Sequence, residues 1–321
     1  CLLIDEAAAT IVAGNIRRSA GMRQFASDDD EAASAKDNLW TENENGEWSI
    51  DPERAALKMA NHTRVYHTKP SYQTILEAVT KQFHSGEGAI QFAPEAIARS
   101  NADILKDEDL KKEFIEIYSE QGKEEARKWI NSSYGPFSEE ELNHRMSRYG
   151  LNPCGEILGT DFHCNLAEVH LNLIDPENIE EQKKAFKAAA LSVACLLNHE
   201  FEVERYRKSR EYDPIVGVSF TGLFDFCVHA FGTPWLKWWE AGRPDNEEGR
   251  TFKKRESEFL DSWRKIVKET VWEYCDKHNL RRPNRCTTVQ PAGTKSLLTG
   301  AAPGWHPPKA QRFIRRITFR K

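Results

Sequence analysis

Hydrophobic and polar positions follow two different periods along the chain, and together they predict an α/β fold. Apolar residues three or four positions apart indicate amphipathic helices, and these cover 2–13, 52–60, 72–83, most of 107–149, 178–198, 222–230 and 249–278. Short apolar or alternating runs indicate strands at 63–67, 89–92, 166–173, 215–220, 286–290 and 312–321. Because helices and strands alternate, the strands are expected to be parallel.

The remaining segments are expected to support this framework. The polar stretch 27–45 is predicted to be a solvated loop or short helix, and the Trp-rich segment 231–244 a packed loop. The helix over 178–198 is apolar on most faces and is expected to be well buried. Three cysteines in apolar helical stretches are predicted to be buried packing residues, namely Cys195, Cys227 and Cys275.

Composition narrows the class of protein. The chain has 321 residues, 39% of them hydrophobic, and a formal net charge of −5. This charge gives no general attraction to nucleic acid, and no apolar run is long enough to span a membrane. The seven cysteines are odd in number and form no CxxC pair. A disulfide scaffold is therefore not expected, and a reducing, cytoplasmic location is.

One candidate for chemistry is the segment LNPCGEIL, which places Asn152, Cys154 and Glu156 at a spacing of two. In an extended segment all three side chains point to one side. An amide, a thiol and a carboxylate on one side can bind a diol, remove a proton and present sulfur to carbon. The alternative is a tight loop whose polar groups satisfy the backbone.

A second candidate is Cys164, ten residues after Cys154. It is either a buried thiol beside a strand or a thiol that takes part in two-electron redox chemistry. A zinc site would have to collect Cys154, His163, Cys164 and His170, whose spacing fits none of the usual structural zinc patterns. No metal site is therefore predicted.

Two further segments are candidates for binding anions. One follows the strand at 286–290 and contains Ala292, Gly293, Thr294, Lys295 and Ser296. If a helix begins there, its N–H groups and the hydroxyls of Thr294 and Ser296 form an anion site; the alternative is a simple helix cap. The other is GNIRRSA at 14–20, whose paired arginines suit phosphates, carboxylates or a structural ion pair.

Together, the segments LNPCGEILGTDFHCNLAEVHLN, GNIRRSA and QPAGTKSLLTGAAPGWHPPKAQRFIRRITF resemble the catalytic subunit of ribonucleotide reductase. The resemblance is to the adenosylcobalamin-dependent (class II) ribonucleoside-triphosphate reductases, and it covers essentially the whole chain in order. It implies an α/β fold, part of a ten-stranded α/β barrel with a central finger loop that carries the radical cysteine. Residues 1–321 are then expected to be an internal fragment of a single catalytic barrel domain, truncated at both ends.

The resemblance also implies a reaction, the reduction of ribonucleoside triphosphates to 2′-deoxyribonucleoside triphosphates. Cys154 corresponds to the thiyl radical that abstracts hydrogen from the ribose 3′ carbon. Glu156 corresponds to the base for the 3′-OH, Asn152 to a substrate ligand, and Cys164 to the later member of the reducing thiol pair. The loop Ala292–Ser296 corresponds to the substrate phosphate site.

The implied cofactor is adenosylcobalamin, and the implied partners are a deoxynucleotide effector and a thioredoxin-type reductant. The effector loop is expected at 58–64, with Asn61 and Arg64 as candidate residues. The sequence departs from the family in its thiols. Cys1 begins a predicted helix and is not assigned as the second reducing thiol, and the family's C-terminal cysteine pair is absent. The isolated chain is therefore not expected to turn over.

Several alternatives stay open at this point. One alternative is the same reaction with diphosphates as substrates, or with a different radical source. That source would be an iron-dependent partner subunit or a glycyl radical. A non-catalytic nucleotide-binding α/β module with buried thiols is another, and it predicts that Asn152, Cys154 and Glu156 point into packing. A zinc-stabilised interaction domain is the third.

Overall fold

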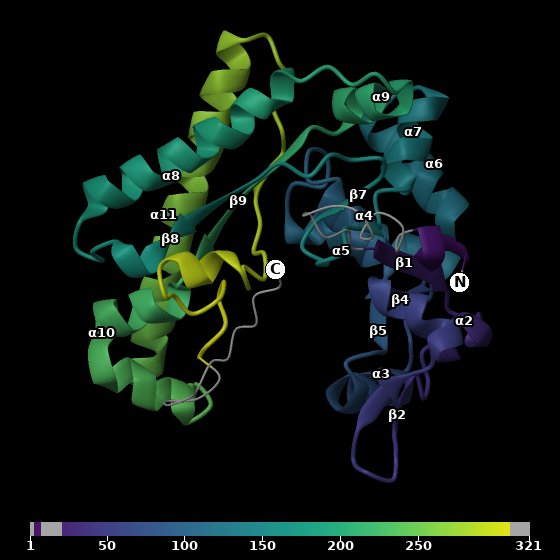
Figure 1. The fold of residues 1–321 in the computed structure, drawn as a ribbon. Coiled ribbons are helices and arrows are strands. Elements are labelled where there is room, and N and C mark those ends of the chain that lie inside the picture. The colour runs from purple at the N-terminus through teal and green to yellow at the C-terminus, as the bar shows by residue number, and fades with distance from the viewer. Residues whose placement is uncertain (1–2, 8–20, 309–321) are drawn as a thin grey trace. The chain divides into compact units, whose positions relative to one another are not determined.

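The computed structural model of the protein describes residues 3–7 and 21–308, and it divides the chain into two compact units, Cys1–Asp161 and Phe162–Lys321 (Figure 1). Residues 3–7 are helical, as expected for the predicted first helix. The rest of that helix, the GNIRRSA segment and the predicted strand at 312–321 lie outside the described residues.

The first unit joins small sheets to a group of helices. Its strands are β1 (Gly21–Ala26), β2 (Trp40–Glu42), β3 (Trp48–Ile50), β4 (Ala60–Tyr66), β5 (Ala89–Phe92), β6 (Gly150–Leu151) and β7 (Leu158–Gly159). Its helices are α2 (Asp30–Ser34), the 3₁₀ helix η1 (Pro52–Met59), α3 (Tyr72–Ser85), α4 (Ala93–Ser100), α5 (Glu108–Gln121), α6 (Lys123–Tyr134) and α7 (Glu139–Met146).

Strand β4 is the centre of a three-stranded sheet with the order β1-β4-β5. Both of its pairings are parallel, with Gly21 opposite Ala60 and Thr63 opposite Ala89, which confirms the predicted strand direction. The strand begins at Ala60 instead of residue 63, because the preceding helix is a 3₁₀ helix that ends at Met59. The predicted loop at 58–64 is therefore mostly strand.

The helices α4 to α7 enclose their own core, with Phe114, Ile130 and Met146 fully buried. Beside this core, the buried Arg145 side chain donates to both carboxylate oxygens of Asp103, at 3.1 and 2.8 Å. Burial alone would raise the pKa of Asp103, but the Arg145 guanidinium reverses this and leaves that pKa below its usual range. The predicted helical character of 107–149 is confirmed, whereas helix α4 was not predicted.

The second unit is a three-stranded sheet covered by long helices. Its strands are β8 (Leu166–His170), β9 (Ile215–Thr221) and β10 (Arg285–Thr287). Its helices are η2 (Leu171–Leu173), α8 (Ile179–Ala194), η3 (Cys195–Asn198), α9 (Glu204–Tyr212), α10 (Leu223–Glu240), α11 (Glu247–Lys277) and η4 (Lys295–Leu298).

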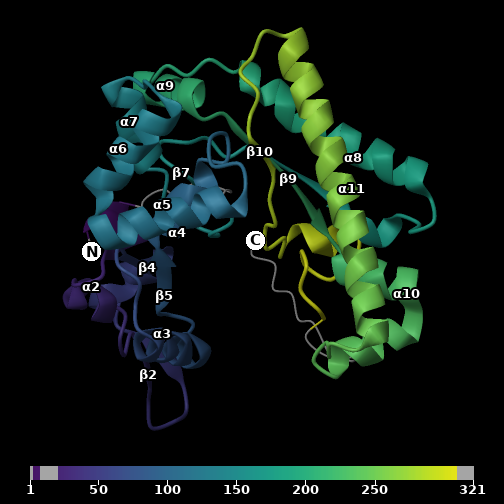
Figure 2. The same ribbon diagram turned by 180° about the vertical axis from the view of Figure 1, so that it is seen from behind.

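The sheet of the second unit has the order β10-β9-β8 and is parallel throughout. On one face, Val169, Val218 and Phe220 pack with apolar residues of α8 and α11 in one core. Figures 1 and 2 show these two helices beside β8 and β9. Alternate residues of β8 and β9 point to the other face, as strand geometry requires. That second face carries the polar side chains discussed below.

Two expectations for the second unit are wrong, and a third holds only in part. The Trp-rich segment 231–244 is largely helical, because α10 continues to Glu240 across a kink at Gly232 (φ 73°, ψ −163°) and buries Trp235 and Trp238. Cys195 is exposed, because it begins η3 on the solvent side of the preceding helix, whereas Cys227 and Cys275 are buried as predicted. The helix over 178–198 also exposes part of its apolar surface, including Leu191 and Leu196.

Within residues 3–7 and 21–308, the sheets are two of three strands and two of two strands. They confirm the α/β class, whereas the ten-stranded barrel and the single barrel domain stay predictions. No helix in these ranges is long and apolar enough to cross a membrane.

Candidate active site

Residues 152–157 form the tip of a short hairpin between β6 and β7, which pair antiparallel. The tip is a tight turn in which the Gly155 N–H donates to the Asn152 carbonyl at 2.9 Å. Gly155 has a φ of +75°, in the left-handed region that favours glycine. The extended segment predicted for Asn152 to Glu156 is therefore wrong, because the backbone folds back at Gly155.

The side chain of Asn152 takes part in the turn. Its Oδ1 accepts a hydrogen bond from the Ile157 backbone N–H at 3.0 Å, and the backbone N–H of Asn152 donates to the Ile157 carbonyl at 3.3 Å. The amide oxygen thus satisfies the backbone, which is the alternative considered from the sequence. The Nδ2 group is the part of this side chain left to donate to a ligand.

Cys154 and Glu156 lie on the same tip in different surroundings. Cys154 is exposed, whereas Glu156 is half-buried and its Oε2 atom is fully buried. An amide donor, a thiol and a carboxylate therefore gather within five residues even though the segment is not extended. A turn in place of an extended segment therefore still presents the three groups that were predicted to bind a diol, remove a proton and present sulfur to carbon.

The hairpin is tied to all three strands of the β1-β4-β5 sheet. Gln24 of β1 accepts from the Leu151 N–H at 3.0 Å and donates to the Tyr149 carbonyl at 3.0 Å. Gln91 of β5 donates to the same carbonyl at 2.9 Å, and Asn61 of β4 donates to the Pro153 carbonyl. These residues position the tip, and no pattern in the sequence predicted a role for Gln24 or Gln91.

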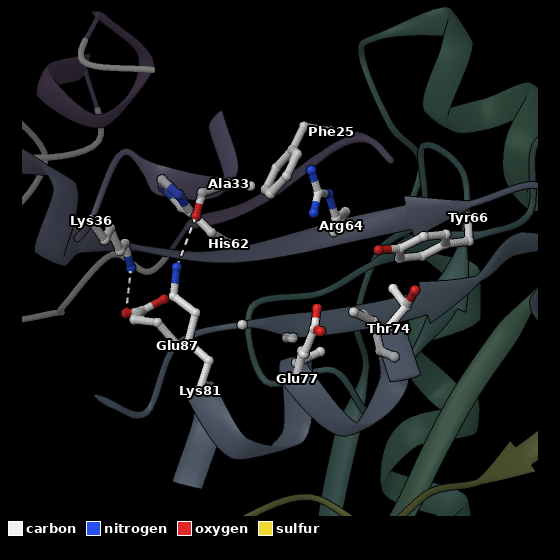
Figure 3. A pocket seen from close by; sticks show the side chains of 14 residues that line it. Phe25, Ala33, Lys36, His62, Arg64, Tyr66, Thr74, Glu77, Lys81 and Glu87 are labelled. Carbon is white, nitrogen blue, oxygen red and sulfur yellow. Dashed lines mark hydrogen bonds and ion pairs between the residues drawn. The ribbon is translucent and has the colours of Figure 1, made fainter. Parts of the chain in front are cut away.

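Asn61 and Arg64 do not form one site, because residues three apart in a strand face opposite sides of the sheet. Asn61 faces the hairpin, whereas Arg64 lines a cavity of about 230 Å³ on the other face, between the sheet and α3 (Figure 3). His62 and Tyr66 share that cavity wall, and the Arg64 guanidinium pairs with Asp30. An effector contact by either residue stays a prediction.

Cys164 belongs to the second unit and is exposed just before β8. Its neighbour Asn165 is buried, hydrogen-bonds the His163 ring at 2.8 Å and accepts from the Gly217 N–H at 2.8 Å. His170 is engaged with Thr299 at 2.8 Å. The ranges 3–7 and 21–308 contain no group of three or more His, Cys, Asp or Glu arranged to hold a metal ion.

The predicted phosphate loop follows β10 at the carboxyl edge of the parallel sheet, where ligands of open α/β sheets bind. Ala292 has a φ of +53°, a rare conformation for a residue with a side chain. Only the 3₁₀ turn η4 follows, so the helix expected at this loop is four residues long. The Ser296 hydroxyl is buried and donates to the Gly293 carbonyl at 3.1 Å, so it serves the loop itself.

Other groups of the loop are available to a ligand. Gly293 has no atom within 4 Å of where a Cβ would stand, so a ligand can approach its backbone closely. The Lys295 side chain is 47% exposed. Further along, Thr221 and Gly222 hold the chain by hydrogen bonds to the Ala302 carbonyl at 3.1 and 2.8 Å.

Comparison with known proteins gives these features a context. The chain is 26% identical over 322 residues to the adenosylcobalamin-dependent ribonucleoside-triphosphate reductase of Lacticaseibacillus paracasei, covering 97% of this chain and 36% of that protein. This chain is a relative of the adenosylcobalamin-dependent ribonucleoside-triphosphate reductases. The proteins of the same name from Lactobacillus acidophilus and Levilactobacillus brevis are 31% and 29% identical over 180 and 177 residues, each match covering 53% of this chain and 23% of that protein. The resemblance stated from the motifs is confirmed.

Solved structures support the fold of such a relative. A B12-dependent (class II) ribonucleotide reductase superimposes with a TM-score of 0.57 at 20% identity, covering 95% of this chain and 36% of that one. The class Id ribonucleotide reductase alpha subunit of Actinobacillus ureae gives 0.52 at 12% identity, covering 90% and 49%. No protein-family model matches the chain. The chain spans between 23% and 36% of the length of the curated relatives named above.

Proposed function

We propose that the protein containing this chain reduces ribonucleoside triphosphates to 2′-deoxyribonucleoside triphosphates with adenosylcobalamin as cofactor. The observation that carries the proposal is the hairpin tip, where Asn152, Cys154 and Glu156 gather in a chain related to such reductases. The two parallel sheets are then parts of the ten-stranded barrel of a single catalytic domain, and the hairpin is its finger loop. A cytoplasmic location follows from the same reaction, which needs reduced thiols.

The three tip residues have distinct roles in this proposal. Cys154, exposed at the turn, becomes a thiyl radical and takes the hydrogen atom from the ribose 3′ carbon. Glu156 accepts the proton of the 3′-OH, because its half-buried carboxylate lies two residues after Cys154 on the same tip and can act as a base. Asn152 donates through Nδ2 to the substrate while its Oδ1 keeps the turn in shape.

The electrons for the reduction come from a pair of thiols, one of which is Cys164. Two thiols become one disulfide, the ribose 2′-OH leaves as water, and Cys154 returns its hydrogen to the 3′ carbon. A thioredoxin-type protein then reduces the disulfide again. The exposed position of Cys164 suits this exchange, which needs a thiolate that a second sulfur can reach. No described cysteine is assigned as its partner.

The phosphates of the substrate are assigned to the loop Ala292–Ser296. The open backbone at Gly293, the Thr294 hydroxyl and the half-exposed Lys295 are the groups that face a ligand. Ser296 supports the loop from within and is not assigned a phosphate contact. A deoxynucleotide effector is proposed to bind at β4, through either Asn61 or Arg64. These two residues lie on opposite faces of the strand.

Adenosylcobalamin, when bound, supplies the radical that is passed to a cysteine. One feature of this chain fits that need, since the Cys154 thiol is exposed at the end of an anchored hairpin and can be reached by a large cofactor. The described residues of the chain are not assigned contacts that would hold the cofactor.

The test is an assay of the full-length protein with each ribonucleotide and with adenosylcobalamin present or omitted. The proposal predicts deoxynucleotide formation from triphosphates only when adenosylcobalamin is present. Formation from diphosphates alone would correct the substrate, and formation without adenosylcobalamin would correct the radical source. Absence of reduction under all these conditions would overturn the proposal in favour of a nucleotide-binding module.

A further inference from the structure

The sheet of the second unit has a polar face opposite the face that packs on α8 and α11. Glu168 of β8 lies directly opposite Ser219 of β9 in the sheet register. The Gln290 N–H, just beyond β10, donates to the Ser219 hydroxyl at 3.1 Å. Glu168, Ser219 and Gln290 therefore lie together on this face, immediately before the loop proposed to bind phosphates.

Glu168 is an unusual buried group. Its side chain is only 3% exposed, and neither of its carboxylate oxygens accepts a hydrogen bond from any residue that the structure describes. Buried carboxylates normally accept several hydrogen bonds, because losing water is costly for a charge. The charged partner of Glu168 is Lys295, whose Nζ lies 3.3 Å from Oε2.

Lys295 is held less firmly than Glu168. Its side chain is 47% exposed, and its Nζ donates to the Gln290 Oε1 at 3.0 Å. An ammonium group has three donors, and Gln290 takes one of them, so at least one remains for an incoming oxygen even with Glu168 3.3 Å away. The Nε2 group of Gln290 is buried and donates to no described residue. Two donors, one of them charged, are thus present beside the loop.

The loop itself does not depend on the ion pair for its shape. The Ser296 N–H donates to the Ala292 carbonyl at 3.1 Å, and the Ala301 N–H donates to the Ser296 carbonyl at 3.0 Å. Lys295 is therefore able to change partners without unfolding the turn. Glu168, on a strand of the sheet, cannot follow it.

We infer that Glu168 is the resident counter-ion of Lys295 and that substrate phosphate replaces it when the loop is occupied. The inference rests on the proposed function, since the loop must bind phosphates. While the loop is empty, Glu168 neutralises Lys295 and so lowers the attraction of the loop for any anion. Glu168 thereby sets the affinity of the site for phosphates without touching them, which makes it a positioning residue.

The experiment is calorimetric titration of the full-length protein with inorganic tripolyphosphate, for the wild type and Glu168→Gln. Glutamine keeps the size of the side chain and removes its charge, so the dissociation constant is expected to fall at least fivefold. Binding to the variant is also expected to weaken more steeply with salt, because the lysine charge is no longer neutralised. Glu202→Gln, which removes an exposed carboxylate just before α9, is the matched control and is expected to change the constant less than twofold.

A second pair of variants separates this role from a structural one. Lys295→Met is expected to weaken tripolyphosphate binding and lower the melting temperature, because it leaves Glu168 buried without its counter-ion. Adding Glu168→Gln to Lys295→Met is expected to restore the melting temperature. If Glu168→Gln lowers the melting temperature but leaves binding unchanged or weaker, Glu168 is only structural and the inference is wrong. If neither wild type nor Glu168→Gln binds tripolyphosphate, the phosphate loop of the proposed function is wrong as well.

Discussion

Asn152 is expected to have two separable roles, because its two amide atoms face different partners. Its Oδ1 accepts from the Ile157 N–H at 3.0 Å and shapes the hairpin tip, whereas its Nδ2 is proposed to donate to the substrate. Asn152→Ala removes both functions. Asn152→Asp keeps an oxygen for the Ile157 N–H and replaces the Nδ2 donor with a second, charged acceptor oxygen, so comparing the two variants separates the structural contact from the donor to substrate.

The expected magnitudes follow from these contacts. Loss of the bond to Ile157 costs about 0.5–1.5 kcal/mol, or up to about 3 kcal/mol if the N–H finds no water. In Asn152→Ala the tip is therefore expected to open, and the Ile157 amide to exchange its hydrogen about 2- to 13-fold faster, or up to about 160-fold faster if the N–H finds no water. In Asn152→Asp that amide is expected to stay protected as in the wild type.

Activity is expected to separate from structure in the second variant. Loss of one donor to the reacting substrate corresponds to about 10²-fold in kcat/KM, so Asn152→Asp is expected to be slow although its tip is intact. The assays are hydrogen exchange at Ile157 and steady-state reduction of ribonucleoside triphosphate by the full-length protein. Wild-type kcat/KM in Asn152→Asp would refute the substrate contact, and unchanged exchange in Asn152→Ala would refute the structural one.

Three further predictions concern thiols, the hairpin and pH. Burial raises the pKa of Cys227 and of Cys286 to about 12. Iodoacetamide at pH 8 is therefore expected to label exposed Cys154 and leave these two unmodified, and rapid labelling of either, measured by mass spectrometry, would contradict their burial. Gly150→Ala places a Cβ 2.5 Å from the Gly159 carbonyl across the hairpin, so it is expected to cost about 1–3 kcal/mol in urea unfolding; an unchanged midpoint would show that the hairpin is not held as described. Burial, and then nearby cations, lower the pKa of His62. The stability that neutral His62 contributes is therefore complete above pH 6.5 and is lost as the pH falls towards its folded pKa, by at most about 1.4 kcal/mol per pH unit. His62→Gln is expected to remove this pH dependence of unfolding, and a variant that keeps the wild-type dependence would show that another group causes it.

The elements that could be predicted from the sequence are those whose own apolar positions determine their structure. The strand at 89–92 has the predicted bounds, and the long helix predicted at 249–278 runs from Glu247 to Lys277. Both are determined by their own apolar positions. The loop predicted for the Trp-rich segment is wrong because α10 continues past a kink at Gly232.

The candidate site could be predicted only in part for a related reason. Asn152, Cys154 and Glu156 were identifiable because they are close in the sequence, but the left-handed turn at Gly155 changed their geometry. The residues that hold the hairpin could not be identified, since Gln24 lies 127 residues before its partner Leu151. Single polar residues inside apolar strands are the signal that points to such ties, and Glu168 carries the same signal.

The Cys154 thiol is proposed to carry the radical. The most direct test of this role is Cys154→Ser in the full-length protein, assayed for adenosylcobalamin-dependent reduction of a ribonucleoside triphosphate. Serine keeps the size of the side chain, but its O–H bond is too strong to pass a hydrogen atom. Activity is expected in the wild type and none in the variant, with the fold and tripolyphosphate binding unchanged. Reduction by Cys154→Ser at a measurable fraction of the wild-type rate would show that Cys154 does not carry the radical.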